Sequence, residues 1–289
     1  MDKKNTISAC IIAHNDEQVI ERCLKSVKGC VDEIVVIHDG PCRDKTLQIA
    51  KKYTKNIIIR PRKGLMEGHL VFAYKKAKGE WILRIDTDEL LQLKTQKIMR
   101  KLVSDEKIDG YSLLFRTQYG RESMATDHKL CLFRKSKVNF LEFPLQVEEI
   151  DGRVAELDYE LEHMPKVNIL DISSLKSRHL VTLKKCALYY LVDFTKLEKL
   201  GNPKIKFTTK LRKKFPAMII PPLVIYYLAM NIFNKHLFIL KGKIGWKLIL
   251  FGALFQIILC YFIHKYKMMG INNIRNIMDY SYLWGEKSK

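Results

Sequence analysis

Paired cysteine motifs are missing from this chain. Its cysteines are scattered and no two form a C-x-x-C pair; they are Cys10, Cys23, Cys30, Cys42, Cys131, Cys186 and Cys260. Zinc sites and disulfide frameworks usually show short, repeated cysteine spacings. We therefore expect reduced thiols, as in a cytosolic protein, and neither a zinc site nor a disulfide framework.

A long apolar run near the N-terminus is also missing, as are internal repeats and low-complexity tracts. The first apolar run, residues 9–13, is too short for the apolar region of a signal peptide. We expect the first half of the chain to stay in the cytoplasm. A length of 289 residues allows one large domain, or one domain with an appendage.

Acidic residues are few relative to basic ones. The chain has 31 Asp and Glu against 51 Lys and Arg, which gives a formal net charge of +20. Such a chain favours anionic partners: nucleic acid, anionic lipid or phosphorylated substrates. Its hydrophobic content of 47% is sufficient for a buried core.

The first hundred residues alternate between apolar runs and amphipathic segments. We predict strands over residues 7–13, 34–37, 57–59 and 81–85, and helices over residues 19–27, 46–53, 67–78 and 91–103. This alternation is typical of an α/β fold with a mostly parallel sheet flanked by helices. Right-handed crossovers would bring the strand ends at Ala13, Asp39 and Asp86 to one edge.

The rest of the chain is less regular. We predict strands over residues 110–115, 130–133 and 154–161, then a basic helical segment over 173–200 and a basic connector over 202–216.

Three acids follow the predicted strand 81–85 within four residues: Asp86, Asp88 and Glu89. Carboxylates are costly in a core unless they are paired or bound to metal. Alternate residues of an extended chain project to the same side, so Asp86 and Asp88 could share one target. A hard divalent cation that bridges to phosphates would suit them. A strand followed by an acidic turn is the simpler interpretation.

Four segments of the first 165 residues match a known pattern in order. They are 11–17 (IIAHNDE) with 21–27, 32–40 (DEIVVIHDG) with 44–46, 77–83 with Asp86–Glu89 (DTDE), and 128–135 with 161–163. Together they resemble a family-two glycosyltransferase with the GT-A fold. The resemblance is to the branch that builds lipopolysaccharide cores and surface glycans. It implies a catalytic domain over 1–165, a basic helical connector over 166–216 and a membrane-associated helical tail over 217–289.

The resemblance implies a nucleotide-sugar donor, with UDP as the default nucleotide. The residues implied to contact the nucleotide are Ala13, His14, Asp16, Asp39 and Asp86, with Asp39 on the base. Asp86 would face the ribose or the metal, and Asp88 would bind Mn²⁺ or Mg²⁺ on the diphosphate. A divalent cation there would neutralise the charge of the leaving group.

His163 is a candidate third metal ligand, since neutral imidazole binds such metals; a structural histidine is the alternative. Glu89 would orient the metal's surroundings or cap the following helix. His69 and His128 are weaker candidates.

An inverting transfer needs a carboxylate that takes a proton from the acceptor hydroxyl. The candidates are Glu148, Asp127 and Glu149, and Glu148 is preferred because the family branch carries a similar acidic element there. A solvated acidic turn is the alternative for Glu148. The chain departs from the family pattern at His38, at residues 41–43 and at Gly68-His69, and the change at 41–43 leaves the identity of the nucleotide's base open.

The C-terminal part contains two largely apolar segments, residues 217–233 and 244–263. The first contains two prolines and the second contains Lys247. Lysines lie on every flank of both segments, against the positive-inside rule for a spanning hairpin. We therefore expect helices that lie in an anionic membrane surface on the cytoplasmic side, peripheral or monotopic, rather than spanning helices or a buried core helix. A glycan or lipid-linked acceptor would suit that place.

Two other classes compete with a glycosyltransferase. A nucleotidyltransferase can share such a sheet and acidic site, but it usually has a glycine-rich basic loop after the first strand, where this chain has the acidic segment 14–17. A non-catalytic basic protein that binds membrane or nucleic acid would suit the charge. No recognised base-reading motif is present, so nucleic acid is not an expected partner. A degenerate, inactive transferase is a further alternative.

Overall fold

The computed structural model describes residues 5–64, 66–119, 121–139, 148–166, 242–270 and a few single positions between 180 and 225. The chain divides into two compact units. Unit 1 comprises residues 1–142 and 146–168, and unit 2 comprises residues 143–145 and 169–289. Most of the predicted connector, 166–216, and the apolar segment 217–233 lie outside the described residues, so the three-part division stays a prediction.

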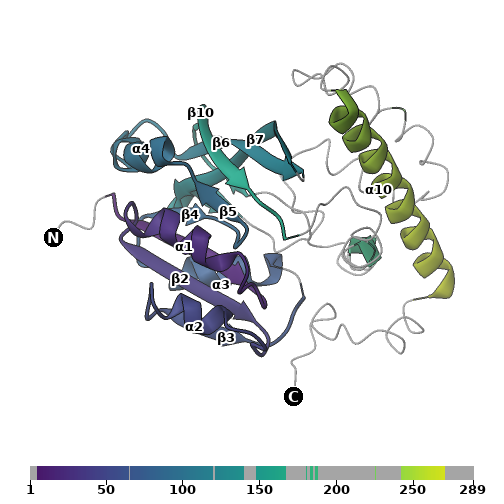
Figure 1. Cartoon of the computed structure of the whole chain (residues 1–289), viewed down its shortest axis with the longest axis horizontal. Coiled ribbons are helices and arrows are strands. Elements are labelled where there is room, and N and C mark those ends of the chain that lie inside the picture. Colours follow the sequence, from purple (N-terminus) through teal and green to yellow (C-terminus); the bar gives the residue numbers. More distant parts are fainter. Residues whose placement is uncertain are drawn as a thin grey trace. The chain divides into compact units, whose positions relative to one another are not determined.

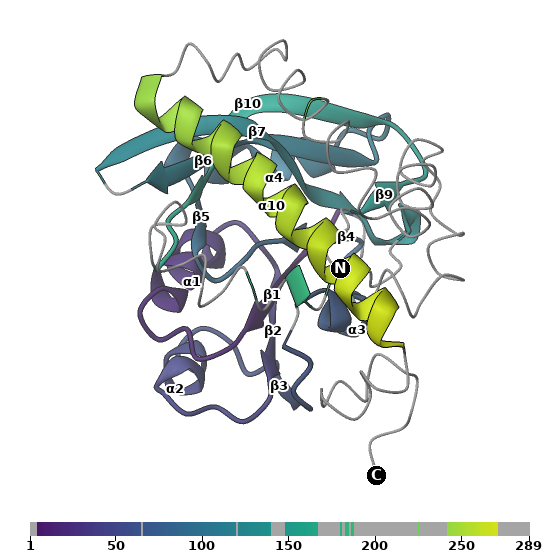
Figure 2. The same cartoon turned by 90° about the vertical axis from the view of Figure 1, so that its right-hand side faces the viewer.

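Unit 1 contains an eight-stranded mixed sheet with the order β3-β2-β1-β4-β7-β6-β10-β5. Its strands are β1 (Ile7–Ala13), β2 (Glu33–Asp39), β3 (Ile57–Arg60), β4 (Trp81–Arg84), β5 (Glu89–Leu91), β6 (Gly110–Tyr119), β7 (Glu122–Arg134) and β10 (Val154–His163). A small second sheet pairs β8 (Val138–Asn139) with β9 (Glu149–Ile150), and a short 3₁₀ helix, η1 (Lys135–Lys137), precedes β8. The first four strands are parallel, and β7 joins β4 in the antiparallel sense. In Figure 2 the long strands β6, β7 and β10 run across the upper part of the view, above β4.

Helices cover both faces of this sheet (Figure 1). They are α1 (Ile20–Lys28), α2 (Thr46–Ala50), α3 (Glu67–Lys76) and α4 (Leu93–Val103). One core packs α1 and α4 against β1, β4 and β6, around fully buried side chains such as Trp81 and Leu24. The other core packs α3 against the opposite face, with Leu70 and Tyr74 on Ile82 and Phe133. The alternating apolar residues of the buried strands serve both cores because successive side chains point to opposite faces.

The strand order creates a topological switch point between β1 and β4. From β1 the chain winds outward through β2 to β3, and α3 then returns it to β4 on the other side of β1. Ligands of open α/β sheets bind outside the carboxyl ends of the strands at such a point. The expected alignment of the strand ends at Ala13, Asp39 and Asp86 is confirmed, because Ala13 pairs with His38 and Cys10 with Arg84.

The acidic motif has a different backbone from the one that the sequence predicts. The extended conformation expected from Asp86 to Asp88 is wrong, and the alternative, an acidic turn after the strand, is confirmed. Strand β4 ends at Arg84, and the Glu89 amide donates to Asp86 O at 3.0 Å to close the turn. The turn leads into β5, a three-residue strand that the sequence does not predict and that pairs with the end of β10. The helix predicted from residue 91 therefore begins at Leu93.

Strand β10 carries an acid at every second position: Glu156, Asp158, Glu160 and Glu162. It pairs with β6 along one side, with a register shift between Leu157 and Glu160. On its other side, β5 pairs only with Leu161–His163. Among the described residues, the first part of β10 therefore forms an edge of the sheet.

All seven cysteines are free, as expected from their spacing. Six are buried and Cys42 is partly exposed. Burial raises the pKa of the Cys30 thiol to about 11 and that of Cys131 to about 12. These thiols therefore pack as small apolar side chains.

Unit 2 contains one long described helix, α10 (Gly242–Met269). It confirms the helix expected over 244–263, and its segment Ile249–Met269 is long and apolar enough to cross a membrane by length and composition. One face of α10 is buried, including Ile249, Cys260 and Ile263. A second face carries exposed apolar side chains that recur every three or four residues; they are Trp246, Leu250, Leu254, Ile257 and Tyr261.

Candidate functional site

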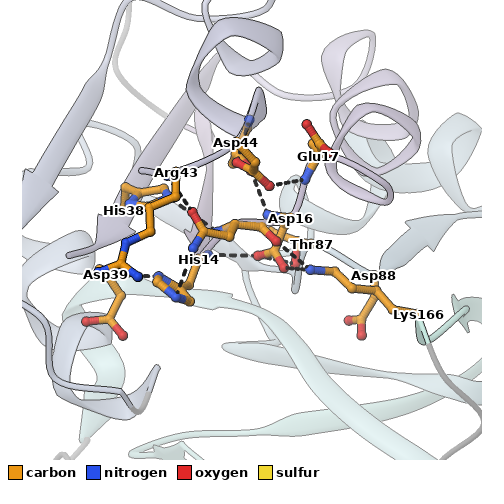
Figure 3. Close-up of polar contacts among 12 residues, drawn as sticks. His14, Asp16, Glu17, His38, Asp39, Arg43, Asp44, Thr87, Asp88 and Lys166 are labelled. Carbon is orange, nitrogen blue, oxygen red and sulfur yellow. Dashed lines mark hydrogen bonds and ion pairs between the residues drawn. The ribbon is translucent and has the colours of Figure 1, made fainter. Parts of the chain in front are cut away.

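The loop after β1 forms the centre of the site (Figure 3). The Asp16 carboxylate accepts hydrogen bonds from the His14 amide at 2.8 Å and the Thr87 hydroxyl at 2.9 Å. Thr87 lies in the turn after β4, so this bond joins the two sides of the switch point. Lys166 places its ammonium 2.5 Å from the same carboxylate and donates to Asn15 O at 2.7 Å. Asn15 has a φ of 52°, a left-handed conformation that asparagine tolerates.

Two contacts fix the His14 ring in this loop. Its Nδ1 lies 2.7 Å from Asp39 O, and its Nε2 lies 3.2 Å from the Asn15 amide nitrogen. The first contact suits an Nδ1–H donor and the second an Nε2 acceptor. Partial burial and the nearby Arg62 guanidinium lower the pKa of His14, which favours the neutral ring.

The predicted base-contacting residue, Asp39, ends β2 and is buried. Its carboxylate accepts the amides of Lys63 at 2.5 Å and Gly64 at 2.8 Å, and it lies 2.8 Å from His69 Nε2. Burial alone would raise the pKa of Asp39, but the hydrogen bonds from His69 and Lys63 lower it to about 2. Asp39 therefore fixes the loop after β3 beside the site.

Asp44 organises the neighbouring loop. Its carboxylate accepts the amides of Thr46 at 2.9 Å and Glu17 at 3.1 Å. Burial opposes the effect, but these hydrogen bonds lower the pKa of Asp44 to about 2. The loops after β1 and β2 are thereby tied together, and Ala13 lies buried below them.

The acids of the turn after β4 point to different partners. Glu89 is buried and its Oε2 accepts the Asp86 amide at 3.0 Å. Lys129 of β7 donates to Asp86 Oδ2 at 3.0 Å and to Glu89 Oε1 at 2.5 Å. Burial alone would lower the pKa of Lys129, but the two carboxylates raise it, so the ammonium stays charged.

Asp88 faces the end of β10. Its Oδ2 lies 3.5 Å from His163 Nε2, and both side chains are about one-fifth exposed. The His163 ring stacks on Phe115 at 5.2 Å and its Nδ1 lies 3.2 Å from the Thr117 hydroxyl, which fixes the imidazole. The amide of Met164 donates to Asp88 O at 2.7 Å. The structure thus brings together Asp88 and His163, two of the predicted metal ligands.

The described residues contain no cluster of three or more side chains able to hold a metal ion. Asp88 and His163 offer one oxygen and one nitrogen donor. Mg²⁺ is often held by one or two carboxylates together with substrate phosphates, and it keeps several waters. The donor set at Asp88 fits a divalent cation whose coordination is completed by a ligand's phosphate groups.

The preferred candidate base, Glu148, is buried away from solvent. Arg84 Nη1 lies 2.5 Å from its Oε2, and the Tyr74 hydroxyl donates to its Oε1. Arg84 ends β4, two residues before Asp86. This contact set suits a residue that positions the end of β4, and its role as a base stays a prediction.

The second candidate base, Asp127, is exposed on β7. It lies directly opposite Phe115 in the β6–β7 ladder. Directly paired residues project to the same face of a sheet, and Phe115 contacts both His163 and Lys129. Asp127 therefore shares the face on which Asp88 and His163 meet. Glu149 lies in β9, in the small sheet.

Sequence reasoning missed two site lysines, Lys129 and Lys166. Lys129 follows polar residues of β7 and directly precedes its apolar segment 130–133, so no local pattern distinguishes it from an exposed lysine. Lys166 follows β10 and meets Asp16 across 150 residues of sequence, and no local pattern indicates that contact.

Part of the chain is similar to a known family of proteins. The model of glycosyl transferase family 2 matches residues 8–144. An uncharacterized glycosyltransferase of Rickettsia bellii is 36% identical over 105 residues, which cover 36% of this chain and 35% of that protein. The lipopolysaccharide core biosynthesis glycosyltransferase LpsC of Rhizobium meliloti is 26% identical over 148 residues, which cover 47% of this chain and 54% of that protein. The match thus spans only about a third to a half of these relatives.

Comparison with solved structures gives a distant match over most of the chain. The crystal structure of S. aureus TarS in complex with UDP-GlcNAc aligns with 98% of this chain and 93% of that chain, at a TM-score of 0.47 and 14% identity.

The order of the first four strands, the acidic turn at the switch point and the family model all concern the same segment. The part of the chain that is similar to glycosyl transferase family 2 is therefore residues 8–144, which contain the first four strands, apart from Ile7, and the acidic turn.

Proposed function

We propose that the protein is an inverting glycosyltransferase that moves a sugar from a nucleotide-diphosphate donor to a glycan or lipid-linked acceptor. The observation that carries this proposal is the Asp88–His163 pair, in which Asp88 belongs to the segment that matches family two and lies in the turn at the switch point. The nucleotide is proposed to lie across the loops after β1 and β2, against Ala13, His14 and Asp16, with Asp39 on the side of the base. UDP is the default nucleotide.

Asp88 and His163 would hold Mn²⁺ or Mg²⁺, with Asp86 on the ribose or metal side. When bound, such a cation supplies positive charge to a leaving diphosphate. The protein's own residues have other tasks. Phe115 and Thr117 fix the His163 ring, and Thr87 fixes the loop that faces the donor.

The acceptor hydroxyl needs a carboxylate that receives its proton. Of the three candidates, Asp127 and Glu148 have contacts that suit different roles, and Glu149 lies in the small sheet. Asp127 is accessible on the face that carries His163, while both Glu148 oxygens accept hydrogen bonds from buried groups. We propose Asp127 as the group that meets the acceptor and Glu148 as the group that holds β4 in place.

Nucleotide binding tests the donor proposal. We expect calorimetry with UDP, dTDP, GDP and ADP to show binding of one nucleotide that is strengthened by Mn²⁺. Asp88→Asn should weaken the metal-dependent binding by about tenfold or more, because it removes the charged metal ligand. Asp158→Asn is the matched control, since its carboxylate is 98% exposed on β10. Binding that is indifferent to Mn²⁺ in every case would contradict the metal site, and no nucleotide binding at all would contradict the donor.

We further propose that the protein lies at the cytoplasmic face of a membrane, as a peripheral or monotopic protein, through α10. The support is the exposed apolar stripe of α10 (Trp246, Leu250, Leu254, Ile257 and Tyr261), with exposed lysines Lys247 and Lys265 on the same helix. A helix with such a stripe and basic flanks suits an anionic interface. Buried residues on another face of α10 favour lying in the surface over spanning it.

Vesicle binding tests this surface. We expect the protein to sediment with vesicles of phosphatidylglycerol and phosphatidylcholine, and to do so less with phosphatidylcholine alone. Leu250→Glu with Leu254→Glu should weaken binding by about tenfold or more, because the apolar contact is lost. Lys25→Glu on α1, which is 65% exposed, is the control for a surface charge change. Equal sedimentation of all three proteins would rule out the stripe as the contact.

A further inference from the structure

Lys129 is an unusual residue for its place in the sheet. It lies on β7 opposite Leu113, a fully buried residue of the main core. Its side chain is only 17% exposed, and its ammonium lies 5.6 Å from the centre of the Phe115 ring. A lysine at such a position is retained only where its charge has partners. Its partners are the Asp86 and Glu89 carboxylates, at 3.0 and 2.5 Å.

Because of these contacts, the two aspartates of the acidic motif have different partners. Asp86 Oδ2 is bound to the Lys129 ammonium, so this carboxylate faces β7. Asp88 instead faces His163, 3.5 Å away. Glu89 closes the arrangement, since one oxygen binds Lys129 and the other accepts the Asp86 amide. The same turn therefore holds one carboxylate, Asp86, that is paired with the Lys129 ammonium, and a second, Asp88, that is not.

We propose that Lys129 is a positioning residue that occupies Asp86 and so limits the metal site to Asp88 and His163. With few protein ligands, a divalent cation binds weakly alone and firmly when diphosphate oxygens complete its coordination. Lys129 thereby makes metal binding depend on the donor. This inference rests on the proposed function and specifies how its metal site is loaded.

The proposal predicts a gain of metal affinity when Lys129 is removed. A purely structural lysine would give only losses. Lys129→Met removes the charge and releases Asp86 as a ligand, so Mn²⁺ alone, without nucleotide, should bind about tenfold more tightly or better. Changes just outside a metal's ligands commonly alter its affinity by about 10- to 100-fold. The electron paramagnetic resonance signal of free Mn²⁺ measures this binding directly.

Three further variants keep the test decisive. Lys129→Arg retains the positive charge and should bind Mn²⁺ as the unmodified protein does. Lys129→Met with Glu89→Gln removes the cation together with one acid. This double variant avoids two unpaired carboxylates and should still show the gain through Asp86. Lys135→Met removes the lysine that directly follows β7, at the start of η1, whose ammonium donates to Ala77 O, and should leave Mn²⁺ binding unchanged.

The outcomes separate this inference from the proposed function. A gain in both Lys129→Met proteins, absent in the arginine variant, supports the inference. Unchanged or weaker Mn²⁺ binding in both folded Lys129→Met proteins overturns it. A second arm repeats the titration with UDP. If no nucleotide binds to any protein, the proposed donor fails, while the comparison with Mn²⁺ alone still decides the role of Lys129.

Discussion

Replacing Arg84 with methionine is expected to lower the free energy of unfolding by about 3–5 kcal/mol. Arg84 and Glu148 form a buried ion pair at 2.5 Å, with side chains that are 10% and 0% exposed. Removing the arginine would leave the Glu148 carboxylate buried with only the Tyr74 hydroxyl as its partner among the described contacts. An uncompensated buried charge is among the most costly single changes in a protein.

Guanidinium denaturation followed by tryptophan fluorescence measures this loss, since Trp81 is fully buried in the adjoining core. The matched variant is Arg84→Met with Glu148→Leu, which replaces both charges by apolar groups. We expect it to recover most of the stability, because an apolar pair can replace a buried ion pair at little cost. A single variant as stable as the unmodified protein would show that the pair is not desolvated.

The same pair affects how activity data are interpreted. If Glu148 is needed for folding, loss of activity in Glu148→Ala would not identify a base. Glu148→Gln retains the size and two polar atoms, so its activity per folded molecule is the informative measurement. Asp127→Asn, on an exposed strand position, supplies the comparison for the second candidate.

Asp39→Asn is expected to cost about 2 kcal/mol at neutral pH, and this cost should disappear in acid. Hydrogen bonds from His69 and Lys63 outweigh burial and depress the pKa of Asp39 from 3.8 to about 2 in the folded protein. A depressed pKa means that the stabilisation is complete above the unfolded pKa. It is lost as the pH falls through the folded pKa, so the window runs from about pH 4 to about pH 2.

Urea unfolding at several pH values between 7 and 3 tests this expectation. The difference between Asp39→Asn and the unmodified protein should be constant above about pH 5 and shrink below about pH 4. Asp158→Asn, at a carboxylate that is 98% exposed, should show no such difference. A difference for Asp39→Asn that does not change with pH would mean that lost packing, and not the charge, explains the effect.

The parallel part of the fold could be predicted from the sequence because it depends on local patterns of apolar residues. The apolar runs of β1, β2 and β4 and the amphipathic residues of α1 specify strand–helix alternation, and alternation specifies which strand ends meet. The predicted strand 130–133 is part of a longer strand, Glu122–Arg134, because pairing with β6 extends it through polar residues. β5 has only three residues and forms by pairing with β10, which is distant in the sequence. A local pattern therefore could not reveal it.

The site was predictable only in part. The predicted alignment of the strand ends at Ala13, Asp39 and Asp86 is confirmed, but the sequence could not say which carboxylates already have protein partners. Those partners are distant in sequence: Lys129 reaches Asp86, and Arg84 reaches Glu148. Side-chain pairing of this kind depends on the register of β7 and on where Glu148 lies in the fold, and neither is a local property.

The alternating acids of β10 also bear on how molecules of this protein meet one another. An unpaired strand edge is a template on which a second chain can add its own strand. Glu156 and Asp158 lie on the part of that edge that no described strand covers, and two copies brought together there would set like charges against each other. The edge is therefore protected against sheet-to-sheet self-association although the molecule as a whole carries a charge of +20. Because salt screens this repulsion, the protection is weakest in concentrated salt.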